Sequence, residues 1–386
     1  MSSGNAMMFA NGALFDLMLA RYIAANPSAF SGSSPVPLPR FGIELEYSVG
    51  GGTPSIDLTP QAGGGSFAIH LPIALKIYGV DDGQRSDDGT SVGVSVVITG
   101  TFALQGQVLQ FAGLKAAGVD GLLETKVAAL FNKDILPELM KGIERIPLPD
   151  LTKTLGVPVQ VVDVQVLNGQ VAVAAQVAGG TGQVEIPYLS PAFPAVTAAL
   201  AGDVINTLAH AQFQPQTAKA SDSDKGRFFG YDAEAEAGAG NPQTRIDGGQ
   251  AQGTLDVWAW AKAGVEVGGV WLEPKLGVSS KVPPLGLRLV SSGSGANLDV
   301  KLYLAGAVRF DVGLPGEIET YADEILGVIG KLGERLTGMI NQALDPISIH
   351  AFTLPHGVPG TNLTANLSFA TQGFLGNSAY AVVHIA

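Results

Sequence analysis

One row of alternating apolar and polar residues, at positions 298 to 314, constrains this chain more than any other feature. The apolar members of the row are Leu298, Val300, Leu302, Leu304, Val308, Phe310, Val312 and Leu314. An ordinary strand has about five or six residues, so the row predicts an unusually long strand with one face buried throughout. A buried face of that length needs an equally long apolar element against it.

Rows of the same kind recur at positions 67–77, 92–108 and 255–267. The glycines inside the rows are Gly100, Gly106 and Gly306. Glycine inside a strand commonly marks a bulge or a bend, and long bent strands are typical of strongly curved sheets. Short turns such as Asn168-Gly169 fit hairpin connections. The rows therefore predict curved antiparallel sheets.

Two segments show helical spacing instead. Apolar residues recur every three or four positions over 120–146 and over 317–344. A long helix with one apolar stripe needs a long apolar surface, which the sheet faces supply. We expect Pro137 to kink the first of these helices. Shorter helical patterns cover 11–25 and, with weak Ala-rich periodicity, 194–211.

The order of these elements repeats along the chain. Each half reads as a short helix, strands, a long helix and closing strands, with the closing strands at 159–177 and 361–385. The turns of the two closing pairs are also similar, Leu167-Asn-Gly-Gln beside Phe374-Leu-Gly-Asn. This order predicts two modules, at residues 1–187 and 188–386.

Charge and composition narrow the function. The chain has 22 Lys and Arg residues against 34 Asp and Glu residues, so its net charge of −12 disfavours nucleic acid and anionic membrane surfaces. It has no cysteine, and its five histidines form no HExxH pair. No GxSxG or GxxxxGK[ST] motif occurs either. We therefore expect no enzyme activity, no cofactor and no metal site.

The N-terminal segment at 6–25 is apolar but lacks the pattern of a secretory signal. No Lys or Arg precedes it, and Asp16 and Arg21 interrupt it. No apolar run reaches the length of a transmembrane helix. We expect a protein without a transmembrane segment, either cytoplasmic or exported without an evident signal peptide.

Three tryptophans are candidates for a docking surface. Trp258 and Trp260 share a strand phase with Asp256 and Lys262, which predicts that they face outward, and Trp271 follows nearby. Tryptophan suits an edge that docks on a membrane or a protein partner. Alternatively, another sheet or loop covers these rings. Since large exposed apolar patches are uncommon on soluble monomers, the second arrangement is favoured.

Several short segments carry a resemblance to a known family. They are Ile143-Glu-Arg-Ile-Pro-Leu-Pro149, Leu155-Gly-Val-Pro158 with the strand at 159–166, Leu167-Asn-Gly-Gln170, Leu344-Asp-Pro-Ile-Ser-Ile349 and Phe374-Leu-Gly376. A long helix that leaves through an Ile-Pro turn into paired strands, used twice, resembles the tubular lipid-binding superfamily, which includes the bactericidal/permeability-increasing proteins. Because the chain lacks that family's cysteine pair and an evident signal peptide, it is closest in character to leaderless bacterial members, such as those of clostridial neurotoxin gene clusters.

The resemblance implies an α+β fold of two tandem modules, each a long helix wrapped by a highly curved antiparallel β-sheet. It also implies a slot for acyl chains between helix and sheet. The residues that we expect to line this slot are Ile69, Leu71, Val94, Val96, Leu302, Leu304 and Phe310. The same residues could instead pack on the helices with no void, and the sequence leaves both arrangements open.

The implied function is non-catalytic binding, sequestration or transfer of a phospholipid or fatty-acid-like ligand. Transient membrane contact and a protein partner are compatible with this function. An alternative is a structural or assembly protein of a bacterial toxin-type gene cluster, with filled cores and a protein partner. A third is a β-rich surface or secretion-associated protein.

Overall fold

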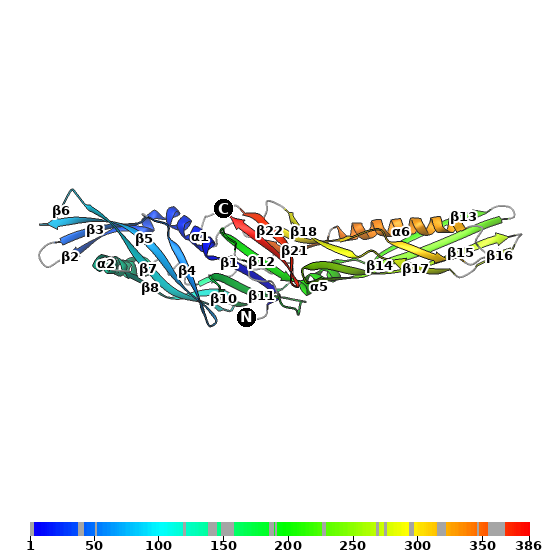
Figure 1. Cartoon of the computed structure of the whole chain (residues 1–386), viewed down its shortest axis with the longest axis horizontal. Helices are drawn as coiled ribbons and strands as arrows, with labels where there is room; N and C mark the ends of the chain where they lie inside the picture. The colour runs from blue at the N-terminus through cyan, green and yellow to red at the C-terminus, as the bar shows by residue number, and fades with distance from the viewer. Residues whose placement is uncertain are drawn as a thin grey trace.

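A computed structural model describes most of the chain. The described residues are 4–37, 42–50, 52–118, 121–137, 145–147, 158–184, 189, 191–225, 229–267, 270–273, 276–292, 297–314, 322–345, 347–353 and 367–386. The molecule is elongated, with the first-half sheet at one end, the second-half sheet at the other, and a third sheet between them near both termini (Figure 1). All strand pairs are antiparallel, as the sequence predicts.

The first-half sheet has the order β2-β3-β5-β7-β8-β9, with β4 and β6 also paired to β5. Its strands are β2 (Ser31–Pro37), β3 (Gly42–Val49), β4 (Ser55–Gln61), β5 (Gly64–Asp81), β6 (Gln84–Arg85), β7 (Thr90–Gln105), β8 (Val108–Gly118) and β9 (Arg145–Pro147). The register of β7 against β8 shifts around Gly100, so the predicted bulge is confirmed. The predicted row at 92–108 is wrong at its end, because Gly106 has a φ of 64° and turns the chain from β7 into β8.

A helical segment covers the middle of β5 and β7. It begins as α2 (Leu122–Leu130) and continues as a π-helical turn, η2 (Phe131–Ile135). Its core residues Val127, Ala128 and Phe131 pack in one cluster with strand residues. The strand members of that cluster are Leu71, Ile73, Leu75, Val94, Val96, Ile98 and Ala116.

The prediction of one continuous helix over 120–146 is wrong at its far end. Ile146 lies in β9 and pairs with Leu109 of β8, so an apolar spacing that suits a helix serves a strand here. The π turn comes just before Pro137. Proline has no N–H to donate and its ring clashes with the carbonyl four residues earlier, so irregular helix geometry is expected there. One long helix in each half is therefore not confirmed.

The middle sheet is built from three strands of each half, in the order β10-β11-β1-β12-β23-β22. They are β10 (Val159–Leu167), β11 (Gln170–Val177), β1 (Ala6–Asn11), β12 (Ala195–Ala201), β23 (Ser378–Ile385) and β22 (Leu367–Leu375). The order is mirrored about the β1–β12 pair, and each half contributes its first strand and its last hairpin. The predicted closing strands at 159–177 are confirmed, and those of the second half are confirmed from Leu367 onward.

Two helices follow the central strands β1 and β12. The helix α1 (Gly12–Ala25) is confirmed, and it begins where Asn11 Oδ1 accepts hydrogen bonds from Leu14 N and Ala195 N, both at 3.1 Å. The predicted helix at 194–211 is wrong up to Ala201, because Ala195–Ala201 form β12 and the helix α5 spans Gly202–Gln212. All seven residues of β12 are buried between neighbouring strands, and this tertiary context overrides the helix preference of alanine.

The second-half sheet carries most of the remaining strands. They are β13 (Gln216–Lys225), β14 (Phe229–Asp247), β15 (Gln250–Val267), β16 (Val270–Leu272), β18 (Leu285–Ser292), β19 (Asn297–Leu304) and β21 (Ser348–Thr353). A separate pair joins β17 (Gly277–Lys281) to β20 (Arg309–Gly313). The helix α6 (Ala322–Leu344) lies along this end of the molecule (Figure 1). Residues 317–321 of the predicted helix lie outside the described residues.

The row at 298–314 does not form one long strand, so the prediction of a single continuous strand is wrong. It divides into β19 and β20, which belong to different sheets, and the bend that separates them contains Gly306. Both strands nevertheless contribute to the core around α6. At the break, Val308 N donates a hydrogen bond to Thr337 Oγ1 of α6 at 2.9 Å. The apolar row is long because two successive strands, β19 and β20, both pack against the same helix, α6.

Candidate ligand cavity

An apolar cavity of about 200 Å³ lies where the first-half sheet meets α1 and the middle sheet. Its twelve lining residues are Phe15, Ile56, Leu58, Phe67, Ile69, Ile98, Phe102, Leu109, Phe111, Leu114, Leu136 and Val171. They come from α1, β4, β5, β7, β8, the end of the π-helical segment and β11. None of these side chains carries a donor, an acceptor or a charge, so the cavity can accept hydrocarbon and cannot hold a headgroup.

Three phenylalanines shape one side of the cavity. The ring of Phe111 lies 6.0 Å from that of Phe67 and 6.0 Å from that of Phe102, measured between centroids. Phe67 occupies the space above Gly100, where an added Cβ would come within 2.5 Å of the ring. The glycine that allows the bulge in β7 therefore also allows Phe67 to reach the cavity wall.

A polar contact outside the cavity joins two of the elements that line it. Ile56 N of β4 donates a hydrogen bond of 2.7 Å to Asp16 Oδ1 of α1. Since Phe15 and Ile56 both line the cavity, this bond fixes two of its walls relative to each other. Burial raises the pKa of the Asp16 carboxyl, the hydrogen bond from Ile56 opposes this rise, and the charge of Asp57 adds to it.

Only part of the lining is shielded from water. Phe67, Ile98, Phe102 and Leu136 are buried, whereas the other eight residues keep intermediate exposure. An apolar cavity of ~150 Å³ can bind benzene, and drug-sized pockets begin near ~300 Å³. The volume therefore suits one short hydrocarbon segment.

Seven residues were predicted to line a slot, and in the structure they lie in three different environments. Ile69 lines the cavity. Leu71, Val94 and Val96 are buried beneath α2 and η2. In the second half, Leu302 and Leu304 are buried and Phe310 is half-buried in the core around α6. The structure does not bring the seven residues together at one site.

Most of the cavity lining escaped the sequence analysis. Phe67 and Phe102 belong to the predicted rows, whereas Leu109 and Phe111 lie on β8, where no clear alternation appears. The spacing of Phe67, Phe102 and Phe111 gave no signal, because they spread over 45 residues of a chain with 16 phenylalanines, four of which lie within 9–41. Periodicity shows which face is buried, but not where a face lacks a partner.

A wider hollow of about 1130 Å³ lies along β2, β3, β5 and β7, near Glu124 of α2. Serine, glycine and charged residues, including Glu46 and Lys76, share its lining with apolar ones. Although larger, this groove is more open and has polar groups in its lining, whereas the apolar cavity has none. We therefore place the candidate site at the smaller cavity.

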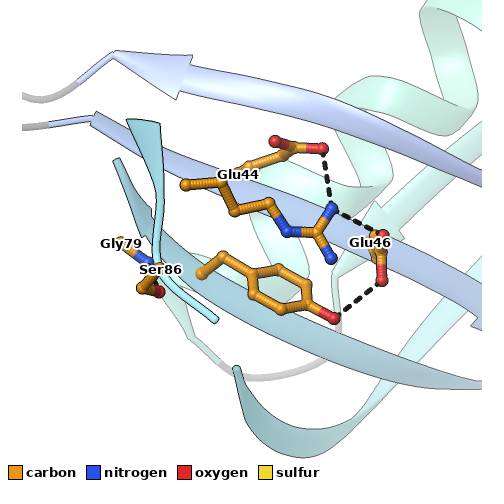
Figure 2. A network of polar contacts seen from close by, with 6 residues as sticks. Glu44, Glu46, Gly79 and Ser86 are labelled. Atoms are coloured by element: carbon orange, nitrogen blue, oxygen red, sulfur yellow. Dashed lines mark hydrogen bonds and ion pairs between the residues drawn. The ribbon is translucent and has the colours of Figure 1, made fainter. Parts of the chain in front are cut away.

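One charged wall of this groove is already paired. The Arg85 guanidinium lies 3.3 Å from the Tyr78 ring centroid and bonds to Glu46 at 2.7 Å and Glu44 at 3.3 Å, while Tyr78 Oη donates to Glu46 at 3.0 Å (Figure 2). The hydrogen bond from Arg85, with that from Tyr78, lowers the pKa of Glu46. The network fixes the β3–β5–β6 end of the sheet, so it has a structural explanation without a ligand.

Two other features bear on the kind of site. In the parts of the chain that the structure describes, no three acidic or histidine side chains gather in a way that could hold a metal ion. None of the helices described there combines the length and apolarity needed to cross a bilayer.

Comparison with known proteins gives little guidance. No protein-family model matches the chain, and no curated protein matches it. A solved structure described as "Crystal structure of lipopolysaccharide binding protein" aligns with 100% of this chain and 99% of its own, at 11% sequence identity and a TM-score of 0.36. A match at this level supports no inference about the ligand of this chain, so the following proposals depend on its own geometry.

Proposed function

We propose that this protein binds a hydrophobic ligand without chemical conversion, with one acyl segment of a phospholipid or fatty-acid-like molecule in the apolar cavity. The observation that carries the proposal is a cavity with twelve apolar lining residues, eight of which remain partly exposed. The chain would act by sequestration or transfer. We further propose that residues 1–187 and 188–386 are two modules of the tubular lipid-binding type, with the described apolar cavity in the first.

The driving force would be removal of hydrocarbon from water. Each buried methylene contributes about 0.8 kcal/mol, so six methylenes would contribute about 5 kcal/mol. The lining offers no polar group that would fix a headgroup. Selectivity would therefore depend on the length and shape of the hydrocarbon, and the headgroup would remain in solvent.

The test is native mass spectrometry of the full chain purified from cells, followed by organic extraction and lipid analysis. We expect a bound fatty acid or phospholipid, and uptake of a fluorescent fatty acid by protein stripped of lipid. The variant Ile69→Phe places a larger side chain in the cavity and should reduce uptake several-fold. Ile43→Phe is a matched control, because Ile43 is a half-buried isoleucine of the same sheet that does not line the cavity.

A bare mass with no uptake would contradict the proposal, and so would equal uptake by the two variants. A bare mass would favour the alternative of a structural or assembly protein. One observation supports that alternative: in the second half the inner residues of β13, β14 and β15 pack in one core cluster with α6.

A further inference from the structure

All three tryptophans of the chain lie exposed on β15 and β16. Trp258 is 49% exposed, Trp260 38% and Trp271 39%, so the expectation that another element covers them is wrong, and their predicted outward orientation is confirmed. These strands reach the end of the molecule far from α1 and β4, which contribute to the apolar cavity (Figure 1). Burial of a tryptophan removes a large apolar area from water, so three exposed rings on one face indicate a docking surface.

Glycines present two of these rings flat against the sheet. Gly238 of β14 is the cross-strand partner of Trp258, and an added Cβ there would clash with the indole. An added Cβ at Gly264 of β15 would meet the Trp271 indole at 2.7 Å. A ring that lies on a glycine has one face against the backbone and presents the other to solvent, which is the geometry that a stacked cation needs.

Negative charge surrounds Trp271. A pocket of about 420 Å³ beside this ring is lined by the carboxylates of Asp232, Glu234 and Glu273, but by one ammonium group, that of Lys262. Lys262 Nζ pairs with Glu234 at 2.8 Å. Trp271 Nε1 donates a hydrogen bond of 3.1 Å to Glu273, which fixes the ring next to a carboxylate. Counted over the described residues that line it, the pocket therefore has an excess of two negative charges.

We propose that this tryptophan face (Trp258, Trp260 and Trp271 with Asp232, Glu234 and Glu273) docks a basic segment of a protein partner. An arginine or lysine of the partner stacks on Trp271 and places its charge between Asp232 and Glu273. Charge complementarity selects this occupant, because carboxylates beside the aromatic rings repel the phosphates of anionic lipids. The net charge of −12 attracts a basic partner at longer range.

The probe is a fluorescein-labelled hepta-arginine peptide, titrated into the full-length protein and followed by fluorescence anisotropy at two salt concentrations. We expect Trp271→Ala to weaken binding by about threefold to tenfold through loss of the stacked ring. Trp271→Phe, which retains an aromatic face, should recover part of the loss. Tyr303→Ala removes another exposed aromatic, on β19, and should change binding less than twofold if stacking at Trp271 is specific.

Two double variants that remove the same charge distinguish the effect of this pocket from that of the net negative charge of the chain. The double variant Asp232→Asn/Glu273→Gln should weaken binding more than Asp87→Asn/Asp88→Asn, which removes the same charge from exposed turn residues at the β6 end. Equal losses in the two double variants, or unchanged binding by Trp271→Ala, would overturn the proposal. Vesicles of phosphatidylcholine or phosphatidylglycerol that bind the wild type and not Trp258→Ala would assign the face to a membrane and would also overturn it.

Discussion

The inner faces of the two end sheets differ in the size of their side chains. Under α2 and η2, the face of β5 and β7 is made of leucine, isoleucine and valine. Under α6, the corresponding face of β13, β14 and β15 is largely alanine: Ala218, Ala220, Ala233, Ala235, Ala237, Ala239 and Ala263. A face of small side chains lets a helix approach closely along its whole length, whereas large side chains hold a helix away from the backbone.

The difference is consistent with the position of the apolar cavity, which lies in the first half. The 23 residues of α6 span about 35 Å at 1.5 Å per residue, and their core cluster combines the alanine face of β13 and β14 with larger residues of β19 and β20. In the first half the described helical segment is shorter and includes a π turn, and the cavity lies near its end at Leu136. Side-chain volume and helix length together determine whether a curved sheet is filled.

The largest effect is expected from Phe131→Ala. Phe131 is fully buried at the start of the π turn, where it packs on the large residues of β5 and β7, so its truncation should cost about 3–5 kcal/mol. Urea denaturation measures the loss. Hydrogen exchange should show faster exchange in β5 and β7 and little change in α6, because the two helices belong to different core clusters.

Unchanged exchange in β5 and β7 would contradict this assignment of the first core. Equal acceleration in α6 would show instead that the two ends unfold together through the middle sheet, and that the comparison of two separate cores fails.

A smaller effect is expected from enlarging the alanine face. Ala237 of β14 is fully buried in the cluster that contains α6, so Ala237→Leu should destabilise the protein by about 1–3 kcal/mol through overpacking. Thr217→Leu on the exposed face of β13 is the control and should change the unfolding free energy by less than about 0.5 kcal/mol. A leucine tolerated at position 237 would reveal unfilled space between β14 and α6.

The leucine-rich face of the first-half sheet was easier to predict from the sequence than the alanine-rich face of the second-half sheet. Rows such as that around Val94 and Val96 stand out because their polar and apolar phases differ strongly, and the structure confirms β5 and β7. In β14, alanine alternates with Asp232, Glu234 and Glu236, and alanine is weakly apolar and favours helices, so the strand left no clear pattern. The same preference produced the error at β12.

The cavity could not be predicted in the same way, because a void depends on how distant elements pack and not on the pattern within one strand. Ile69 could be assigned to a buried face from its alternation, but the approach of α1 and β11 to that face depends on long-range packing. Nothing in the local pattern distinguishes Ile69 from Leu71, although one lines the cavity and the other packs under α2 and η2.

The smallest effect concerns the contact between α1 and β4 at the cavity. Because burial raises the pKa of Asp16 in the folded protein, the folded state holds this proton more tightly than the unfolded state. The contribution of Asp16 to stability is therefore fully present below the ordinary aspartate pKa of about 3.9, and it is lost as the pH rises through the folded value. Asp16→Asn removes this dependence and leaves an oxygen to accept the bond from Ile56 N.

Urea midpoints of the two proteins between pH 3 and pH 7 test this prediction. The midpoint of Asp16→Asn minus that of the wild type should increase with pH, with most of the change just above the ordinary aspartate pKa. Asp87→Asn, at an exposed turn, supplies the control for loss of one charge. Parallel curves for Asp16→Asn and the wild type would mean that α1 does not shield this carboxyl. The wall formed by Phe15 and Ile56 would then be more open to solvent than the packing of the first half indicates.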